Sequence, residues 1–349
     1  MTTPNRLDQI QAIFTNNNLP SYRFGQIKSA IYEAKFSLYS QISTLSKEIR
    51  TQLTNELGDE ILTLKKVTQV EGDNAHKVLF ETVDGKKLET VRLTYNDHTA
   101  LCLSTQSGCA LGCAFCATGA LGLMKNLTTD EIIDQVLYFK KVGYHIDRLI
   151  FMGMGEPFSN PIATFEAITA ITDPDQLAMS PYRLSVSTVG IVPGIKRLTK
   201  EFPQVNLAFS LHSPFPDQRR KLMPITNAYP IDKVFVAIDE HLAATNHKVF
   251  ISYILLNGVN DKLEHAAALS NLIKASPDRL RLLHVNLIRF NPGPTKQTFQ
   301  KSPPEAVRAF QAILNQNKVK NTLRQDFGVR INAACGQLAA TTNPSAAQN

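Results

Sequence analysis

Hydrophobic positions in the first sixty residues recur at helical spacing. They fall every three or four residues at Leu7, Ile10, Ile13 and Phe14, and again at Ile27, Ala30, Ile31 and Ala34. This period predicts short amphipathic helices. We expect a small helical accessory domain over residues 1–62.

The next forty residues alternate between apolar and polar side chains, as strands do. Segments 77–82 and 87–93 each show this alternation, and Val83-Asp84-Gly85 lies between them as a turn. We therefore expect a β-hairpin extension over residues 63–103.

A regular succession of helices and strands follows. Thr128 and Glu131 form a capping box that opens a helix, Gly143 ends it, and residues 148–152 read as a buried strand. Further helices are predicted near 161–171, 192–201, 231–243, 262–275 and 304–316, and further strands near 183–188, 205–211, 248–256 and 282–288. This alternation predicts an α/β fold with a parallel sheet, curved into a partial (βα)6 barrel over residues 104–338. The small, polar tail at 339–349 is expected to be disordered.

Four polar segments come at the predicted ends of these strands. They are Gly153-Met-Gly-Glu156, Ser187-Thr188, Ser210-Leu-His212 and Arg289-Phe-Asn291. Ligands of parallel βα folds gather at the carboxyl ends of the strands, so these segments are candidate binding residues.

Charge and composition indicate a partner. The chain has a formal net charge of +7, and from Arg279 onward ten Lys and Arg face only Glu305 and Asp326. Such an excess favours a polyanion such as RNA or DNA, although a basic, merely soluble surface is the alternative. The predicted phosphate contacts are Arg219, Arg220, Lys221, Arg289, Lys296, Lys318, Lys320 and Arg324, and Phe215 and Phe290 are candidates for stacking an extruded base. With no long apolar run and a polar N-terminal segment, the protein is expected to be soluble, free of the membrane and cytoplasmic.

The cysteines carry the most specific signal. Cys109, Cys113 and Cys116 stand at x3 and x2 spacing in a glycine-containing loop, with Phe115 before the last of them. Three thiolates at this spacing predict ligands of a [4Fe–4S] cluster with one open iron. A zinc site is the alternative, but His98 is the nearest histidine outside the motif, and three structural thiols are another.

Several motifs together resemble one enzyme family. They are the cysteine loop, Met152-Gly-Met-Gly-Glu156-Pro, Leu184-Ser-Val-Ser-Thr188, Phe209-Ser-Leu-His212-Ser-Pro, Asn286-Leu-Ile-Arg-Phe-Asn291-Pro and Ala333-Ala-Cys335-Gly-Gln-Leu. From about residue 20 to 338 the chain is similar to the radical S-adenosylmethionine (SAM) adenine methyltransferases of 23S rRNA.

Within that family, the chain resembles Cfr-type enzymes, which methylate C8 of an adenosine at the peptidyl transferase centre and confer antibiotic resistance. Segments 116–119, 211–214 and 288–291 carry this preference, and the housekeeping C2 enzymes typically have a Trp where Phe290 stands. Pro157 is closer to the housekeeping pattern, so methylation of C2, in rRNA and tRNA, is the alternative.

The resemblance implies a mechanism. Cys335 accepts a methyl group from SAM, a 5′-deoxyadenosyl radical removes hydrogen from it, and the methylene radical adds to the base. Cys102 is the candidate thiol that releases the product, ending as a disulfide with Cys335. Glu89 aligns with the family's proton acceptor, and the sequence leaves open whether Glu89 or Cys102 takes the ring proton.

The resemblance also implies cofactor contacts and partners. The residues expected to hold SAM are Gly155, Glu156, Ser187, Ser210, Leu211, His212 and Asn291. The expected partners are 23S rRNA before ribosome assembly is complete and an electron donor such as flavodoxin or ferredoxin.

Two other classes of function stay open at this point. One is a non-catalytic RNA-binding or ribosome-assembly protein whose cysteines hold a structural metal, with Cys335 an ordinary buried cysteine. The other is a radical SAM enzyme that acts on a protein or a small molecule.

Overall fold

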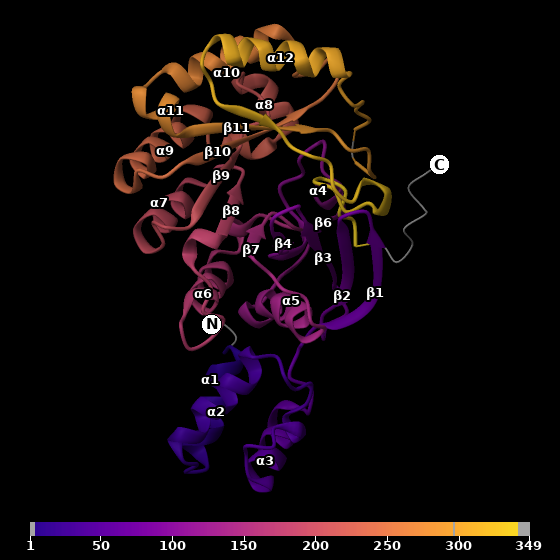
Figure 1. The fold of residues 1–349 in the computed structure, drawn as a ribbon, viewed down its shortest axis with the longest axis vertical. Helices are drawn as coiled ribbons and strands as arrows, with labels where there is room; N and C mark the ends of the chain where they lie inside the picture. Colours follow the sequence, from indigo (N-terminus) through magenta and orange to yellow (C-terminus); the bar gives the residue numbers. More distant parts are fainter. Residues whose placement is uncertain (1–3, 296, 341–349) are drawn as a thin grey trace.

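One continuous mixed sheet organises the molecule (Figure 1). The structure is a computed structural model that describes residues 4–295 and 297–340. The ten strands of this sheet run in the order β1-β2-β3-β4-β7-β8-β9-β10-β11-β12, and β5 and β6 form a separate ribbon. The strands are β1 (Lys65–Gly72), β2 (Ala75–Glu81), β3 (Lys87–Thr94), β4 (Thr99–Cys102), β5 (Gln106–Cys109), β6 (Gly122–Asn126), β7 (Arg148–Phe151), β8 (Leu184–Thr188), β9 (Asn206–Ser210), β10 (Val249–Leu255), β11 (Leu283–Arg289) and β12 (Asn321–Leu323).

Helices cover the outer face of the curved part of this sheet (Figure 1). The α-helices are α1 (Arg6–Asn16), α2 (Ser21–Tyr32), α3 (Lys47–Leu57), α4 (Ala117–Leu121), α5 (Thr129–Lys141), α6 (Pro161–Thr172), α7 (Val192–Glu201), α8 (Pro216–Leu222), α9 (Ile231–Thr245), α10 (Leu263–Lys274), α11 (Pro277–Leu282) and α12 (Pro304–Gln316). Short 3₁₀ turns lie at η1 (Tyr39–Gln41), η2 (Pro157–Ser159), η3 (Pro181–Arg183), η4 (Pro224–Asn227) and η5 (Val329–Ile331).

The predicted α/β architecture is confirmed. Strands β4 and β7 to β12 pair in parallel, and α5, α6, α7, α9 and α10 stand between successive strands. The capping box that opens α5 is present, with Thr128 accepting from the backbone of Glu131 and Glu131 returning the bond. Each buried strand is paired on both sides, which satisfies its backbone and leaves its carboxyl end free to present side chains.

The extension is larger than the predicted hairpin. Strands β2 and β3 pair across the expected turn, but β1 adds a third antiparallel strand at the edge. The pattern did not reveal β1 because its side chains are almost all exposed and carry no apolar alternation. Strand β4 lies inside the range predicted for the extension, yet it pairs in parallel with β7, so the barrel begins at Thr99.

The predicted tail also begins later than residue 339. Ala339 is buried and Ala340 is partly buried, and the backbone N–H groups of both donate to Glu89. The sequence did not reveal these contacts, because the backbone of the two alanines forms them and their side chains do not. The remaining predicted tail, 341–349, lies outside the described residues.

The helical accessory region, α1 to α3, stands at the end of the molecule opposite α12 (Figure 1). Arg6 joins it to the barrel: its guanidinium lies 2.6 Å from the Asp134 carboxylate of α5, and its backbone N–H donates to Asp130. Asp134 also accepts from the backbone and hydroxyl of Thr63. Both charged side chains of the pair are buried, so each depends on the other.

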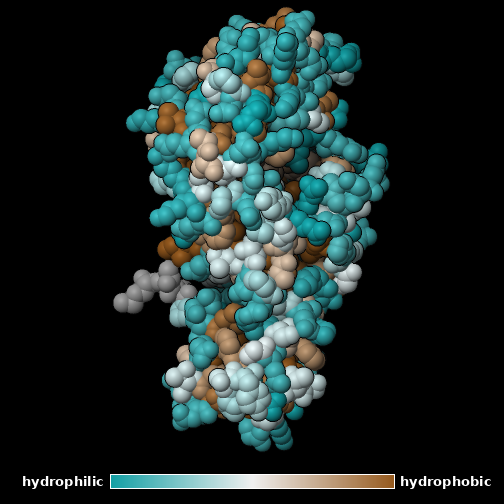
Figure 2. Space-filling model, turned by 60° about the vertical axis from the view of Figure 1, so that its left-hand side comes forward, coloured by the Kyte–Doolittle hydropathy of each residue, from teal (hydrophilic) through white to brown (hydrophobic). Residues whose placement is uncertain are grey.

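Hydrophilic residues predominate on the face drawn in Figure 2, where apolar residues form small separate groups. Among the described residues, no helix combines the length and the apolar character that crossing a membrane requires.

Replacing Arg6 with Met should destabilise the protein strongly, because Asp134 would keep a buried charge without its cation. We expect a loss of about 3–5 kcal/mol in the free energy of unfolding, measured by urea denaturation. Lys28→Met is the matched control, since its pair with the exposed Asp175 also joins the accessory region to the barrel. That variant should lose at most about 1 kcal/mol. Equal losses in the two variants would contradict this account of the junction.

Candidate functional site

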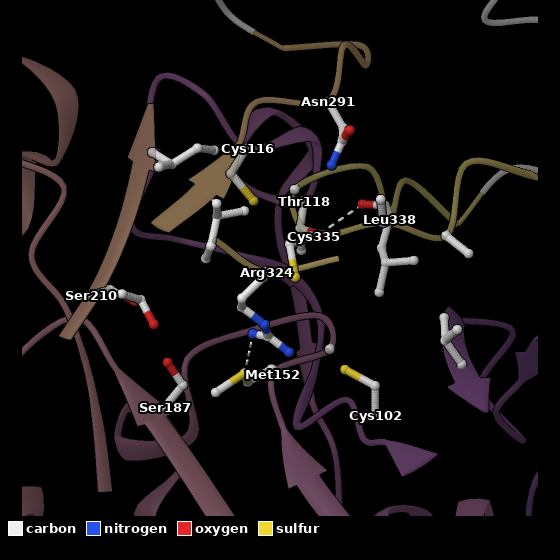
Figure 3. A pocket seen from close by; sticks show the side chains of 18 of the residues that line it. Cys102, Cys116, Thr118, Met152, Ser187, Ser210, Asn291, Arg324, Cys335 and Leu338 are labelled. Atoms are coloured by element: carbon white, nitrogen blue, oxygen red, sulfur yellow. Dashed lines mark hydrogen bonds between the residues drawn. The ribbon is translucent and has the colours of Figure 1, made fainter. Parts of the chain in front are cut away.

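A cavity opens at the carboxyl ends of the barrel strands, where the sequence predicted ligands (Figure 3). Six of the seven residues predicted to bind SAM line it: Gly155, Glu156, Ser187, Ser210, His212 and Asn291. Cys102, Cys116 and Cys335 line the same cavity. The structure thus brings together side chains that are more than 200 positions apart in the sequence.

Leu211 is the exception among the predicted binding residues. Its side chain is fully buried in the main hydrophobic core and is absent from the cavity lining. Ser210 and His212 flank it and point the other way, as neighbouring positions at a strand end do. Only the backbone of Leu211 has a polar role, accepting a hydrogen bond from Arg219.

The cysteine loop is folded by β5, α4 and β6. Gly108 has a φ of +73°, and a Cβ there would meet the carbonyl of Gly122, so this position requires glycine. Cys109 and Cys113 are buried and Cys116 is partly exposed toward the cavity. Phe115, between them, packs edge-to-face on His212 and fixes the loop against the barrel.

The three thiols lie close enough to influence one another electrostatically. Burial and the nearby Cys116 together raise the pKa of Cys109 to about 11, against the lowering effect of a backbone hydrogen bond from Leu111. Burial and both neighbouring thiols raise the pKa of Cys113 well above its ordinary range. Ligation to iron would offset this cost, because a metal ligand is deprotonated by its cation.

Within residues 4–295 and 297–340, no three His, Cys, Asp or Glu side chains form a group suited to one metal ion. A [4Fe–4S] cube takes each thiolate on a different iron, so its ligands need not converge on one ion.

Glu156 is a buried carboxylate at the end of the segment after β7. Its oxygens accept backbone N–H groups from Phe158 and Val189, which join the ends of β7 and β8. Burial raises the pKa of Glu156 to about 7, against the lowering effect of hydrogen bonds from Thr188, Val189 and Phe158. An ammonium group of a cofactor that paired with Glu156 would therefore contact a carboxylate that these hydrogen bonds already hold in place.

Asn291 supplies an open polar contact. Its side chain is buried at the cavity wall, and its Oδ1 accepts no hydrogen bond from any described residue. A buried amide oxygen without a donor is costly, and a ligand donor would satisfy it. Ser187 and Ser210 point into the cavity from the ends of β8 and β9 (Figure 3). The donor set therefore fits a polar cofactor such as SAM.

His212 is a neutral wall residue. Its Nδ1 accepts the backbone N–H of Ile254 at 3.0 Å, and burial and the nearby Arg219 lower its pKa to about 3. An imidazole that stays neutral and has one nitrogen engaged serves packing and hydrogen bonding and has no need of a metal.

Residues 332–340 form a segment that carries Cys335 across the cavity mouth, here called the Cys335 arm. The carbonyls of Gly336 and Leu338 accept from the Ala117 N–H and the Thr118 hydroxyl at the start of α4. Gln337 donates to the carbonyl of Pro292. These bonds hold Cys335 directly over the cysteine loop, and its side chain is exposed. An exposed thiol in a cavity excludes the alternative of an ordinary buried cysteine.

Cys102 faces the same cavity from the end of β4, and both thiols are free. Burial, and then Cys335, raise the pKa of Cys102 to about 12, while Arg324 acts in the opposite direction. The Arg324 side chain enters the space between the two cysteines, with Met152 beside it (Figure 3). Cys102 is consequently a protonated thiol at neutral pH, with one cation placed to favour its ionised form.

Glu89 does not line the cavity. It is fully buried on β3, on the same face as the cavity residues Val91 and Leu93, and the end of the Cys335 arm covers it. Its Oε1 lies 2.8 Å from the ammonium of Lys77 on β2. Lys77 was missed by sequence reasoning, although a lysine within the otherwise apolar run of a buried strand was a visible signal.

Several predicted RNA contacts are wrong. Arg219 is fully buried and donates to three backbone carbonyls and Thr226, which makes it part of the core. Phe290 is buried in a cluster with Phe115 and cannot stack a base. Arg324 serves the cavity as described above. Lys296 lies outside the described residues. Arg219 and Phe290 both lie beside segments that line the cavity. There, residue type alone does not show whether a side chain points into the core or toward the surface.

The other predicted RNA contacts remain accessible. Arg220, Lys221, Lys318 and Lys320 are exposed, Arg289 is partly exposed beside Asp326, and Phe215 is 37% exposed.

Comparison with known proteins gives consistent similarities. Residues 103–269 match the model of the radical SAM superfamily. The chain is 46% identical over 332 residues to "Ribosomal RNA large subunit methyltransferase Cfr" of Staphylococcus warneri, covering 95% of each protein. It is 43% identical to the protein of that name from Bacillus velezensis, covering 97% of each. A crystal structure of a radical SAM methyltransferase from Sphaerobacter thermophilus superposes with a TM-score of 0.89 at 36% identity, over 98% of each chain.

The raised pKa of Glu156 predicts a pH-dependent stability. The unfolded carboxyl ionises near 4.5 and the folded one near 7, so the folded state binds the extra proton and loses stability as pH rises through this window. Above it, the penalty amounts to roughly 3 kcal/mol. Urea unfolding of SAM-free protein at several pH values should show wild type falling relative to Glu156→Gln between pH values of about 4.5 and 7.5. Parallel curves for the two proteins would contradict this assignment.

Proposed function

Because this chain belongs to the Cfr family of radical SAM large-subunit rRNA methyltransferases, we propose that it methylates C8 of an adenosine at the peptidyl transferase centre of 23S rRNA. The observation that carries this proposal is the cavity in which the exposed Cys335, the second thiol Cys102 and the cysteine loop meet. Methylation there would protect the ribosome from antibiotics that bind this centre.

The reaction needs a radical because C8 of adenine is not nucleophilic enough to attack a sulfonium methyl group. A [4Fe–4S] cluster and SAM, when bound, supply the 5′-deoxyadenosyl radical that this chemistry requires. Cys109, Cys113 and Cys116 are the proposed cluster ligands, leaving one iron for SAM. Gly155, Glu156, Ser187, Ser210, His212 and Asn291 are the proposed SAM contacts, and Leu211 supports them from the core.

Cys335 is the proposed methyl carrier. Its sulfur attacks the methyl carbon of one SAM molecule, so that a thioether forms and the sulfonium loses its methyl group. Cys335 is exposed on an arm whose anchoring hydrogen bonds leave its thiol free, and this position suits a residue that must meet both cofactor and RNA. A hydrogen atom of this S-methyl group would then pass to the 5′-deoxyadenosyl radical, and the methylene radical left on the Cys335 sulfur would form a carbon–carbon bond with the base.

Cys102 is the proposed releasing thiol: its thiolate attacks the Cys335 sulfur, the bond between that sulfur and the methylene carbon breaks, and the two cysteines end as a disulfide. The carbon keeps the electron pair of the broken bond and takes up a proton to become the methyl group of the product. The raised pKa of Cys102 bears on whether Glu89 or Cys102 takes the ring proton, which the sequence left open. A thiol that already holds its proton is a poor acceptor for the ring proton, which favours Glu89 as the base. Arg324 lies where its charge would assist Cys102 when the thiol must ionise.

RNA would meet the basic surface outside the cavity. Arg220, Lys221, Arg289, Lys318 and Lys320 are the proposed phosphate contacts, and Phe215 can stack a base at the rim. The cluster would receive its electrons from a small carrier protein such as flavodoxin or ferredoxin. Such partners, and a substrate met before ribosome assembly is complete, place the protein in the cytoplasm.

Nucleoside mass spectrometry of rRNA tests the reaction. A methylation-deficient host that expresses the wild-type protein should contain 8-methyladenosine, and the same host with Cys335→Ala should contain none, because the methyl carrier is lost. Product formed without Cys335 would refute the carrier role. Finding 2-methyladenosine in place of 8-methyladenosine would assign the protein to the C2-methylating enzymes, and finding neither would favour another substrate or a non-catalytic role.

Iron content and visible absorption test the cluster ligands. Cys113→Ala, after anaerobic reconstitution, should lose both signals because the cube would keep only two protein ligands. Cys335→Ala serves as the matched control, since it removes a cavity thiol outside the cysteine loop and should keep both signals. Retention of a full cluster by Cys113→Ala would overturn the assignment.

A further inference from the structure

Lys77 contacts both the proposed base and the segment that carries the proposed methyl carrier. Its ammonium lies 2.8 Å from Glu89 Oε1 and donates to the carbonyl of Asn332 at 3.1 Å. Only 7% of the Lys77 side chain is exposed. Burying an ammonium is costly unless it is paired and hydrogen-bonded, and here one partner is on β3 and the other is on the Cys335 arm.

Sheet register explains this placement. Lys77 pairs with Val91 and Leu79 pairs with Glu89, so Lys77 and Glu89 are diagonal neighbours on one face of the antiparallel β2–β3 pair. Long side chains at such positions reach each other. The two charged groups are thus set by rigid strands, whereas the arm that covers them is held by separate hydrogen bonds.

The two oxygens of Glu89 are used differently. Oε2 accepts the backbone N–H groups of Ala339 and Ala340 at 3.0 and 3.2 Å. Oε1 faces Lys77 and accepts no well-aligned hydrogen bond from the described residues. The arm therefore occupies the carboxylate from one side and the ammonium holds it from the other.

Glu89 Oε2 therefore cannot accept a substrate proton while the Cys335 arm is bound to it. Leu338 lines the cavity and Glu89 lies behind the arm, so a substrate carbon can reach Oε2 only after residues 339–340 have withdrawn. Withdrawal removes both hydrogen bonds to Oε2. Lys77 then remains as a charged partner that still contacts Oε1 and holds the buried carboxylate in position.

We propose that Lys77 is a positioning residue with two roles: it anchors the seated Cys335 arm at Asn332, and it pairs with Glu89 and orients that carboxylate when the arm leaves. The proposal rests on the function proposed above for Glu89 and Cys335. Addition of the methylene radical leaves one unpaired electron on the ring, and this electron would return to the oxidised iron–sulfur cluster. In the step that Lys77 supports, the ring C–H bond breaks, its electron pair restores the aromatic ring, and the proton forms an O–H bond with Glu89. Lys77 itself exchanges no proton and touches no substrate.

The first measurement is hydrogen–deuterium exchange of the arm in purified, full-length protein without RNA. Lys77→Met should raise the exchange of amides in 332–340 by roughly ten-fold, the equivalent of losing one charge-assisted hydrogen bond. Lys77→Arg should keep the protection. The control is Lys65→Met, the same substitution at an exposed position on the neighbouring strand β1, which should match the wild type.

The second measurement is the fraction of protein joined covalently to RNA, read on a denaturing gel after reaction. Lys77→Met should methylate Cys335 and attach to RNA but release product roughly 100-fold more slowly, as expected when a general base is lost. Adduct should then accumulate, and Lys77→Arg should release product normally. A merely structural defect would lower every step without accumulating adduct.

A double variant tests whether Lys77 acts through Glu89. Lys77→Met combined with Glu89→Gln should release product no more slowly than Glu89→Gln alone, because the partner charge is already gone. It should also fold if Lys77→Met does not, since no unpaired buried carboxylate remains.

Three outcomes would each overturn the proposal. The first is hydrogen–deuterium exchange of the arm at the wild-type rate in Lys77→Met. The second is loss of protection or of product release in Lys77→Arg as well as in Lys77→Met, and the third is additive losses of product release in the double variant. The yield of 8-methyladenosine from wild type tests the proposed function separately, and the exchange comparison does not depend on it.

Discussion

Two hydrogen bonds to backbone carbonyls bring Cys335 and the cysteine loop into one place. The N–H of Ala117 and the hydroxyl of Thr118 hold the carbonyls of Gly336 and Leu338, across a separation of 220 positions in the latter case. They fasten the Cys335 arm to the first turn of α4, directly after the cysteine loop. The barrel supplies the cavity, but without this junction the exposed thiol would have no fixed relation to the cysteine loop or to Cys102.

The Cys335 arm contributes only backbone carbonyls to this junction, which suits a segment that is proposed to exchange partners. Backbone bonds fix position without requiring a particular side chain, and each contributes only modestly to stability. The arm can therefore be seated firmly by several such bonds and still be displaced by RNA. The charged groups beneath it, Lys77 and Glu89, belong to rigid strands and keep their arrangement in either state.

Local patterns predicted the barrel well because each of its elements has a recognisable sequence signal. Strands β7, β9 and β10 are short, largely apolar runs, β8 and β11 alternate buried apolar with polar residues, and α5 carries its capping box. The breaks between these elements contain Gly and Pro. The cavity residues at the strand ends followed from topology, since parallel strands deliver their carboxyl ends to one edge. The cysteine loop followed from spacing alone. Edge strand β1, whose exposed side chains have no period, was beyond this kind of reasoning.

Direction and burial were harder to predict than position in sequence. Arg219 and Phe290 sit next to cavity residues and have the residue types of RNA contacts, yet both point into the core. The buried Arg219 donates to carbonyls of two separate segments, at Val189 and at Ser210 and Leu211, and no local pattern reports such convergence. Leu211 was misplaced for the related reason that strand alternation turns it away from its two neighbours.

The same limit explains why Lys77 was overlooked while Glu89 was found. Glu89 was proposed through family resemblance, which reports a role without its surroundings. Its cation comes from the adjacent strand and its cap comes from a segment 250 positions away. What a carboxylate can do depends on these partners, because a buried oxygen that holds two N–H groups is unavailable to a substrate until they leave. The proposed role of Glu89 as a base therefore depends on which partners contact it at each step. Those partners are set by tertiary contacts, which the sequence alone does not show.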